Sequence, residues 1–128
     1  YDENYCDLAI LKYKKALNCL NIIKDSIPIS YTYKTIGNVY QLLDKTDSAL
    51  YHYRRSLEIY SGLTNKLDIE KSIAQILFEK GERDSAYTLI KNNLDKLDNY
   101  SQRDSYYATF GEMYYMDKVY DSAIFYLE

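Results

Sequence analysis

The chain has 128 residues, of which 47% are hydrophobic, and this apolar fraction argues for a folded domain and against a disordered segment. Its 4 Gly and 1 Pro are too few for a β fold, which needs a turn every 8–12 residues or so. The net charge of −3 provides no basic surface of the kind that nucleic-acid binding requires.

Hydrophobic periodicity predicts helices along the whole chain. In chain order these helices span about residues 2–24, 28–43, 47–60, 65–80, 84–97, 101–116 and 120–128. Turn signals separate them, among them Pro28, Gly62 and Gly81. Gly81 is a suitable residue just after a helix, because glycine adopts the left-handed conformation without strain. The short connections favour antiparallel neighbours, so the predicted fold is all-α with about seven antiparallel helices.

The first predicted helix contains both cysteines, Cys6 and Cys19. Thirteen residues of helix separate them by roughly 20 Å, beyond the reach of a disulfide. No signal peptide, transmembrane run or lipidation signal is visible, and because the chain starts at Tyr1 we expect it to be cut from a longer protein. The localisation therefore stays open between cytoplasm and periplasm, and no membrane contact by this part is expected.

One tripeptide, Asp-Ser-Ala, occurs three times at equal spacing. The copies begin at Asp47, Asp84 and Asp121, which are 37 residues apart. A fixed period of about 20–50 residues is typical of a repeat array. We expect each Asp to cap a helix through its side-chain oxygen and to favour the helix dipole. Phosphorylation of the neighbouring serines, Ser48, Ser85 and Ser122, is the alternative interpretation.

Other positions keep the same register. The first and third copies form an aromatic, apolar-small, aromatic, Ala, aromatic-or-apolar series: Tyr33, Ile36-Gly37, Tyr40, Ala49 and Tyr53, and Tyr107, Phe110-Gly111, Tyr114, Ala123 and Leu127. The second copy is weaker, with Glu70 and Leu77 in the aromatic positions, but Ile73-Ala74, Ala86 and Ile90 fit. The small residues, Gly37, Ala74 and Gly111 together with the three Ala, are expected to let paired helices approach closely.

This series resembles the tetratricopeptide repeat (TPR), whose signature places an aromatic residue, Leu-Gly, Tyr, Ala and Phe at fixed offsets. The resemblance implies an α-α superhelix, the TPR solenoid, although the family period is 34 residues and this one is 37. It divides a single domain, 1–128, into a half-repeat helix (1–26), repeat 1 (27–63), repeat 2 (64–100) and a truncated repeat 3 (101–128).

Catalytic chemistry has little support in the sequence. His52 is the only histidine, and we expect it to be an ordinary surface or half-buried helix residue. No His/Cys group has metal-ligand spacing, and the four Gly are isolated, so no phosphate loop is present. We therefore predict a protein that is not an enzyme, with no catalytic residue, metal or cofactor.

The TPR resemblance implies that the leading helix of each repeat lines a concave groove. The expected peptide-binding residues are Tyr31, Lys34, Asn38, Gln41, Asp68, Lys71, Gln75, Phe78, Glu112 and Tyr115. Lys34 and Asn38 match part of the carboxylate clamp of one TPR subclass. Ser72, Ser105 and Thr109 occupy its remaining positions, where the clamp uses Asn and cations, so that clamp is not expected.

The expected function is non-enzymatic binding of an extended protein or peptide segment on the concave, Tyr-rich face. The domain would be the sensory or scaffolding region of a larger regulatory protein, resembling TPR arrays of bacterial signalling proteins. The alternative is a structural or oligomerisation domain that packs on a neighbouring domain or on a second copy as a homodimer. Nucleic acid is not an expected partner of this part.

Overall fold

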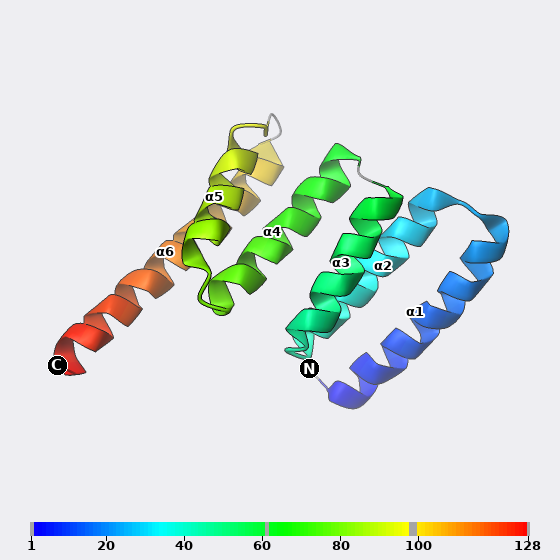
Figure 1. Cartoon of the computed structure of the whole chain (residues 1–128), viewed down its shortest axis with the longest axis horizontal. Helices are drawn as coiled ribbons and strands as arrows, with labels where there is room; N and C mark the ends of the chain where they lie inside the picture. Colours follow the sequence, from blue (N-terminus) through cyan, green and yellow to red (C-terminus); the bar gives the residue numbers. More distant parts are fainter. Residues whose placement is uncertain (1, 61, 98–99, 128) are drawn as a thin grey trace. The chain divides into compact units, whose positions relative to one another are not determined.

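The structure is a computed structural model that describes residues 2–60, 62–97 and 100–127, with the backbone alone at 23, 100–101 and 119–127 (Figure 1). Every regular secondary-structure element among these residues is an α-helix. The helices are α1 (Glu3–Ile23), α2 (Ser26–Leu42), α3 (Thr46–Ile59), α4 (Leu63–Glu79), α5 (Arg83–Leu94) and α6 (Tyr100–Leu127). The all-α prediction is confirmed.

The 37-residue period of the sequence is also present in the helix boundaries. α2, α4 and α6 begin at residues 26, 63 and 100, and α3 and α5 begin at residues 46 and 83. Each step between equivalent starts is 37 residues. The recurrence of residue types therefore corresponds to a recurrence of local structure.

The turns after α2 and α4 repeat in the same register. Asp44 (φ 57°) and Gly81 (φ 91°) both adopt the left-handed conformation. In each turn the next amide donates back to a carbonyl five residues earlier, Lys45 to Tyr40 at 3.0 Å and Glu82 to Leu77 at 2.9 Å. These bonds are the Schellman closure of a helix C-terminus, and they confirm the role predicted for Gly81.

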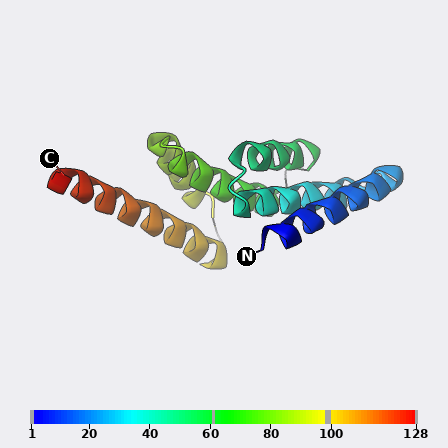
Figure 2. The ribbon, with the colours of Figure 1, turned by 90° about the horizontal axis from the view of Figure 1, so that it is seen from below.

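α6 differs from the prediction, because it continues through the break expected between residues 116 and 120. Figure 2 shows it as one uninterrupted ribbon, so the described chain has six helices and not seven. Lys118 stands one period after Gly81 but remains helical. Neither Gly nor Pro lies between 116 and 120 to end the helix.

Asp47 and Asp84 of the Asp-Ser-Ala copies do not cap helices as predicted, and the side chain of Asp121 in the third copy lies outside those that the structure describes. The cap positions of α3 and α5 are Lys45 and Glu82, and neither contributes a side-chain cap hydrogen bond. Asp47 and Asp84 lie inside the first turn, where a carboxylate still favours the helix dipole. Side-chain caps occur instead at Asp2, which accepts from the amide of Asn4 at 2.8 Å, and at Asp25.

The chain divides into two compact units, residues 1–69 and residues 70–128, and α4 contributes to both. In unit 1, α2 packs against α1 and against α3 (Figure 2). Its apolar core contains Leu17, Ile29 and Ile36, with half-buried residues around them: Leu20, Tyr33, Tyr40 and Ile59.

A buried polar cluster completes unit 1. Ser30 and Ser56 exchange hydrogen bonds between α2 and α3, with Oγ of Ser30 2.9 Å from the Ser56 carbonyl and Oγ of Ser56 2.7 Å from the Ser30 carbonyl. Asn65 at the start of α4 donates to Oγ of Ser30 at 3.2 Å. Ser30 lies near the start of α2 and Ser56 near the end of α3, so their contact means that the two helices are antiparallel.

Unit 2 also has a buried polar side chain at the position equivalent to Ser56. Asn93, one period after Ser56, is buried and donates to Glu70 of α4 at 3.3 Å and to the Tyr106 hydroxyl of α6 at 3.2 Å. Tyr106 and Met113 are also buried on α6, which packs against α5. A polar side chain that joins three helices is thus a repeated feature of the fold.

The small residues of the repeat separate into two groups. Ala49, Ala74 and Ala86 are completely buried, and a Cβ on Gly37 would lie 2.8 Å from the Tyr53 ring. Gly111 is exposed, and a Cβ there would meet nothing within 4 Å. The close-packing role predicted for Gly111 is therefore wrong, because none of the described residues approaches Gly111 as Tyr53 approaches Gly37.

Candidate binding surface on α2, α4 and α6

All ten predicted binding residues lie on α2, α4 and α6, and none of them is buried. The members in unit 1 are Tyr31, Lys34, Asn38, Gln41 and Asp68, and those in unit 2 are Lys71, Gln75, Phe78, Glu112 and Tyr115. Tyr31 and Tyr115 are the most exposed aromatic members, at 44% and 67%. Each unit therefore presents its own accessible set.

In unit 1 a lysine links two of the predicted residues. The Lys34 ammonium lies 4.6 Å from the centre of the Tyr31 ring and 3.8 Å from Oδ2 of Asp68. Only 17% of the Lys34 side chain is exposed, against 49% for Asp68. A ligand carboxylate would have to compete with Asp68 for this ammonium, which agrees with the expectation that no carboxylate clamp forms.

Two amide side chains of α2 in unit 1 are held by hydrogen bonds to a buried tyrosine of α3. The buried Tyr53 of α3 directs its hydroxyl toward Oδ1 of Asn38 at 2.6 Å and Oε1 of Gln41 at 2.8 Å. The amide groups are thereby oriented on the α2 surface. Oriented amides of this kind can pair with the backbone of an extended peptide, which carries both donors and acceptors.

In unit 2 two of the predicted residues are engaged with other side chains. Lys71 donates to the Ser105 hydroxyl, which joins α4 to α6. The Phe78 ring meets the Tyr87 ring edge-on at 6.0 Å, and the Arg83 guanidinium lies 5.3 Å from its centre. Phe78 is therefore partly a packing residue, whereas Glu112 and Tyr115 are exposed.

Tyr87 belongs to a polar network beside Phe78. Its hydroxyl donates to Oδ2 of Asp117 at 2.7 Å, and Arg83 forms an ion pair with the same carboxylate. Loss of hydration and the bond to Asp117 raise the pKa of Tyr87 to about 12. The phenol therefore stays protonated as a donor over the physiological range.

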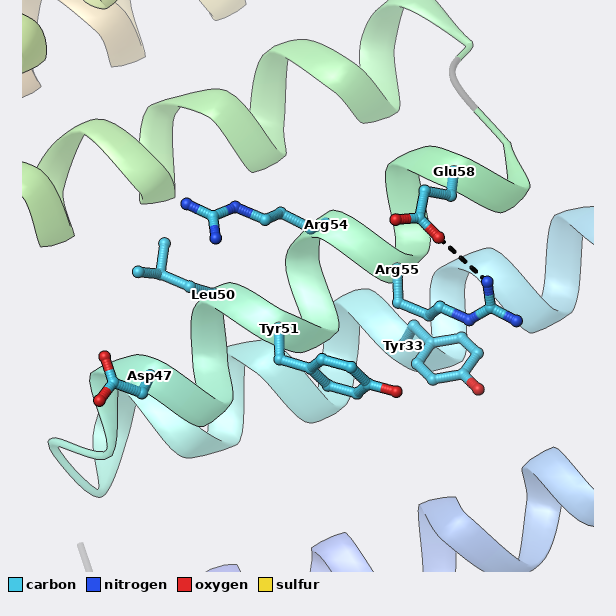
Figure 3. A pocket seen from close by; sticks show the side chains of 7 residues that line it. All are labelled: Tyr33, Asp47, Leu50, Tyr51, Arg54, Arg55 and Glu58. Atoms are coloured by element: carbon cyan, nitrogen blue, oxygen red, sulfur yellow. Dashed lines mark hydrogen bonds and ion pairs between the residues drawn. The ribbon is translucent and has the colours of Figure 1, made fainter.

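The sequence interpretation did not find a hollow that opens on α2 and α3 (Figure 3). It measures about 600 Å³ and is lined by Tyr33, Asp47, Leu50, Tyr51, Arg54, Arg55 and Glu58. Arg55 pairs with Glu58 at 3.0 Å, and this bond is the main cause that raises the pKa of the Arg55 guanidinium. Two cations face two carboxylates, so the hollow has no net preference for a charged ligand.

His52 lies among aromatic rings on α3. Its ring centre is 5.1 Å from that of Tyr40 and 5.9 Å from that of Tyr33, and Nδ1 is 2.8 Å from the Ser48 carbonyl. Burial lowers the pKa of the imidazole, and the nearby charge of Lys14 lowers it further. The prediction of a half-buried helix residue is confirmed.

Among the residues that the structure describes, no group of three or more His, Cys, Asp or Glu side chains is placed to hold a metal ion. No described helix is both long and apolar enough to cross a membrane. Comparisons of the chain with family models, with curated proteins and with solved structures gave no match.

Proposed function

We propose that this chain is a non-enzymatic, TPR-like helical repeat domain that binds an extended segment of a partner protein. The observation that carries the proposal is the recurrence of helix starts and Schellman turns every 37 residues. Repetition of one hairpin unit gives each repeat equivalent surface positions, and repeat proteins use such positions as extended binding sites.

The side chains at these positions support a peptide ligand. Asn38 and Gln41 present oriented amides, and Tyr31 and Tyr115 present exposed rings. Amides match the repeating hydrogen-bond groups of an extended backbone, while tyrosine rings provide contact area at a low cost in conformational entropy. The mixed charge of Lys34, Asp68, Lys71 and Glu112 suits a segment that is not strongly charged.

A selection from a random peptide library, followed by anisotropy titration of the selected peptides, tests this function. A variant that combines Lys34→Ala, Gln75→Ala and Tyr115→Ala is expected to bind at least about 10-fold more weakly, as is usual when central contacts are truncated. The matched control combines Lys12→Ala, Tyr51→Ala and Arg54→Ala, three exposed residues outside the predicted set. Equal binding by the wild type and the first variant would contradict the proposed surface.

A further inference from the structure

The hairpin of α2 and α3 shows how a leading helix and the helix that follows it fit together in this repeat. Gly37 of α2 packs against the Ala49 carbonyl and the Tyr53 ring of α3. Ala49, Tyr53 and Ser56 are completely buried. A glycine on one helix and an alanine and a tyrosine on the other therefore define the contact.

α1 carries the same series as α3, but its face is open. The series occurs 40 positions earlier in the sequence, as Ala9, Tyr13 and Ala16. Ala9 and Ala16 are only half-buried, and Tyr13 is 37% exposed. Leu17, on another side of the helix, joins α1 to the apolar core of unit 1. α1 is thus a following helix whose contact with a leading helix is not made among the described residues.

α6 is a leading helix whose contact face is open. Tyr107, Gly111 and Tyr114 lie two periods after the α2 residues that face α3. Tyr107 and Tyr114 are 55% and 53% exposed, and no described atom lies within 4 Å of a Cβ placed on Gly111. Ala108 and Tyr115 are exposed on the same side of the helix. Contiguous exposed apolar surface of this kind marks an interaction site.

We propose that copies of the chain associate head to tail, with the Gly111 face of α6 in one copy packed on the Ala9 and Tyr13 face of α1 in the next. Gly111 takes the place of Gly37, so the contact reproduces between two chains the hairpin formed within unit 1. One chain carries both open faces, and each has the residues that complete the other. Because the faces lie on different helices, the interface is heterologous, and successive copies form a ring or an open chain.

A cation–aromatic pair of the hairpin is kept at this junction. In unit 1 the Arg55 guanidinium of α3 lies 5.9 Å from the centre of the Tyr33 ring of α2. The equivalent pair across the junction is Lys15 of α1 and Tyr107 of α6, and both are exposed in their own chains. A lysine ammonium is attracted to a tyrosine ring as a guanidinium is.

The tyrosine hydroxyl of the contact also has an acceptor. In unit 1 the Tyr53 hydroxyl lies 2.6 Å from Oδ1 of Asn38. The equivalent pair across the junction is Tyr13 and Glu112, and a carboxylate accepts a hydrogen bond more strongly than an amide. Glu112 is also in the predicted peptide-binding set, but the inference does not rest on the proposed function, because the two open faces carry it.

One contact of the hairpin has no equivalent at the junction. In unit 1 Ser30 and Ser56 exchange buried hydrogen bonds. Asp104 and Ala16 take their places, and alanine has no hydroxyl. We therefore expect a reversible contact that dissociates at roughly micromolar concentrations.

Sedimentation across micromolar to sub-millimolar concentrations tests the association. The wild type is expected to associate as its concentration rises. Ala9→Glu and Gly111→Leu each place a larger side chain in one of the two faces, and each is expected to raise the dissociation constant at least about 10-fold. Asn18→Glu is the matched control, because Asn18 is exposed on the opposite side of α1, and it should associate like the wild type. Circular dichroism checks that each variant keeps its helix content.

A mixture of the two blocked variants identifies the faces that meet. Ala9→Glu keeps an intact α6 face and Gly111→Leu keeps an intact α1 face, so an equimolar mixture is expected to form a 1:1 heterodimer. A wild type that is monomeric at every concentration would overturn the inference and would assign these faces to another occupant. So would a blocked variant that associates as tightly as the wild type, or a mixture of folded variants that stays monomeric.

Discussion

The ring of Tyr53 lies directly against the backbone of Gly37, so close that a Cβ on Gly37 would stand 2.8 Å from Cδ1 and Cε1 of the ring. The Tyr53 side chain is completely buried, and its hydroxyl lies within hydrogen-bond distance of the side-chain oxygens of Asn38 and Gln41 on α2. One residue thereby packs α3 against α2 and orients two of the predicted binding amides.

Gly37→Ala is expected to destabilise the protein by about 1–3 kcal/mol, because its methyl group would displace the Tyr53 ring. Gly111→Ala is the matched comparison. It is expected to stabilise by up to about 1 kcal/mol, since alanine favours a helix and nothing lies within 4 Å. Urea unfolding measures the free energy of unfolding of both variants. Changes of the same sign in the two variants would contradict the packing described.

Ser30→Ala is expected to lower the free energy of unfolding by about 1–3 kcal/mol. The change removes the acceptor of Asn65 and a donor to the Ser56 carbonyl, both in a buried cluster. Ser26→Ala is the control, because Ser26 is exposed at the start of the same helix, and its change should stay within about 0.5 kcal/mol. Urea unfolding measures both variants. Equal decreases in the free energy of unfolding would mean that the buried hydrogen bonds of Ser30 do not stabilise the fold.

His52 is expected to make the protein less stable as the pH falls from about 7 toward 5. Its pKa is lowered by burial in the folded state, so the unfolded chain binds the proton more readily. The stability that the neutral imidazole of His52 provides is fully present above the ordinary pKa of 6.5, and it is lost as the pH falls through the lower pKa of the folded state. His52→Gln should flatten the pH dependence of the melting temperature in this window, because the chain has no other histidine. An unchanged slope in the variant would refute this account.

Tyr53→Phe is expected to weaken peptide binding severalfold while it lowers the free energy of unfolding by only about 1 kcal/mol. The ring packing on Gly37 is kept, but Asn38 and Gln41 lose the hydroxyl that orients them. Titration of a library-selected peptide measures the first effect and urea unfolding the second. A full loss of stability with unchanged affinity in the folded fraction would mean that the hydroxyl acts on folding alone.

The bounds of the first five helices followed from the sequence to within a few residues, whereas the break predicted between 116 and 120 and the predicted Asp caps were wrong. The all-helical fold and the turn at Gly81 were predicted because apolar periodicity and glycine conformation are properties of short segments. The accessible positions of the ten predicted binding residues agree with the register of the repeat, although their role in binding stays a prediction. The hollow beside Tyr33 and Arg55 was missed, since its lining comes from two helices and only the adjacent pair Arg54-Arg55 marked it in the sequence.

The sequence by itself determined the period of 37 residues, the starts of the helices and the positions that are buried within a hairpin. Tertiary structure alone decided which repeated positions have a partner. Gly37 and Gly111 occupy the same place in the repeat, yet Tyr53 packs on the first and open space surrounds the second. The physical reason is the turn before the partner helix, which forms at Asp44 and Gly81 in the left-handed conformation, whereas at Lys118 the helix continues.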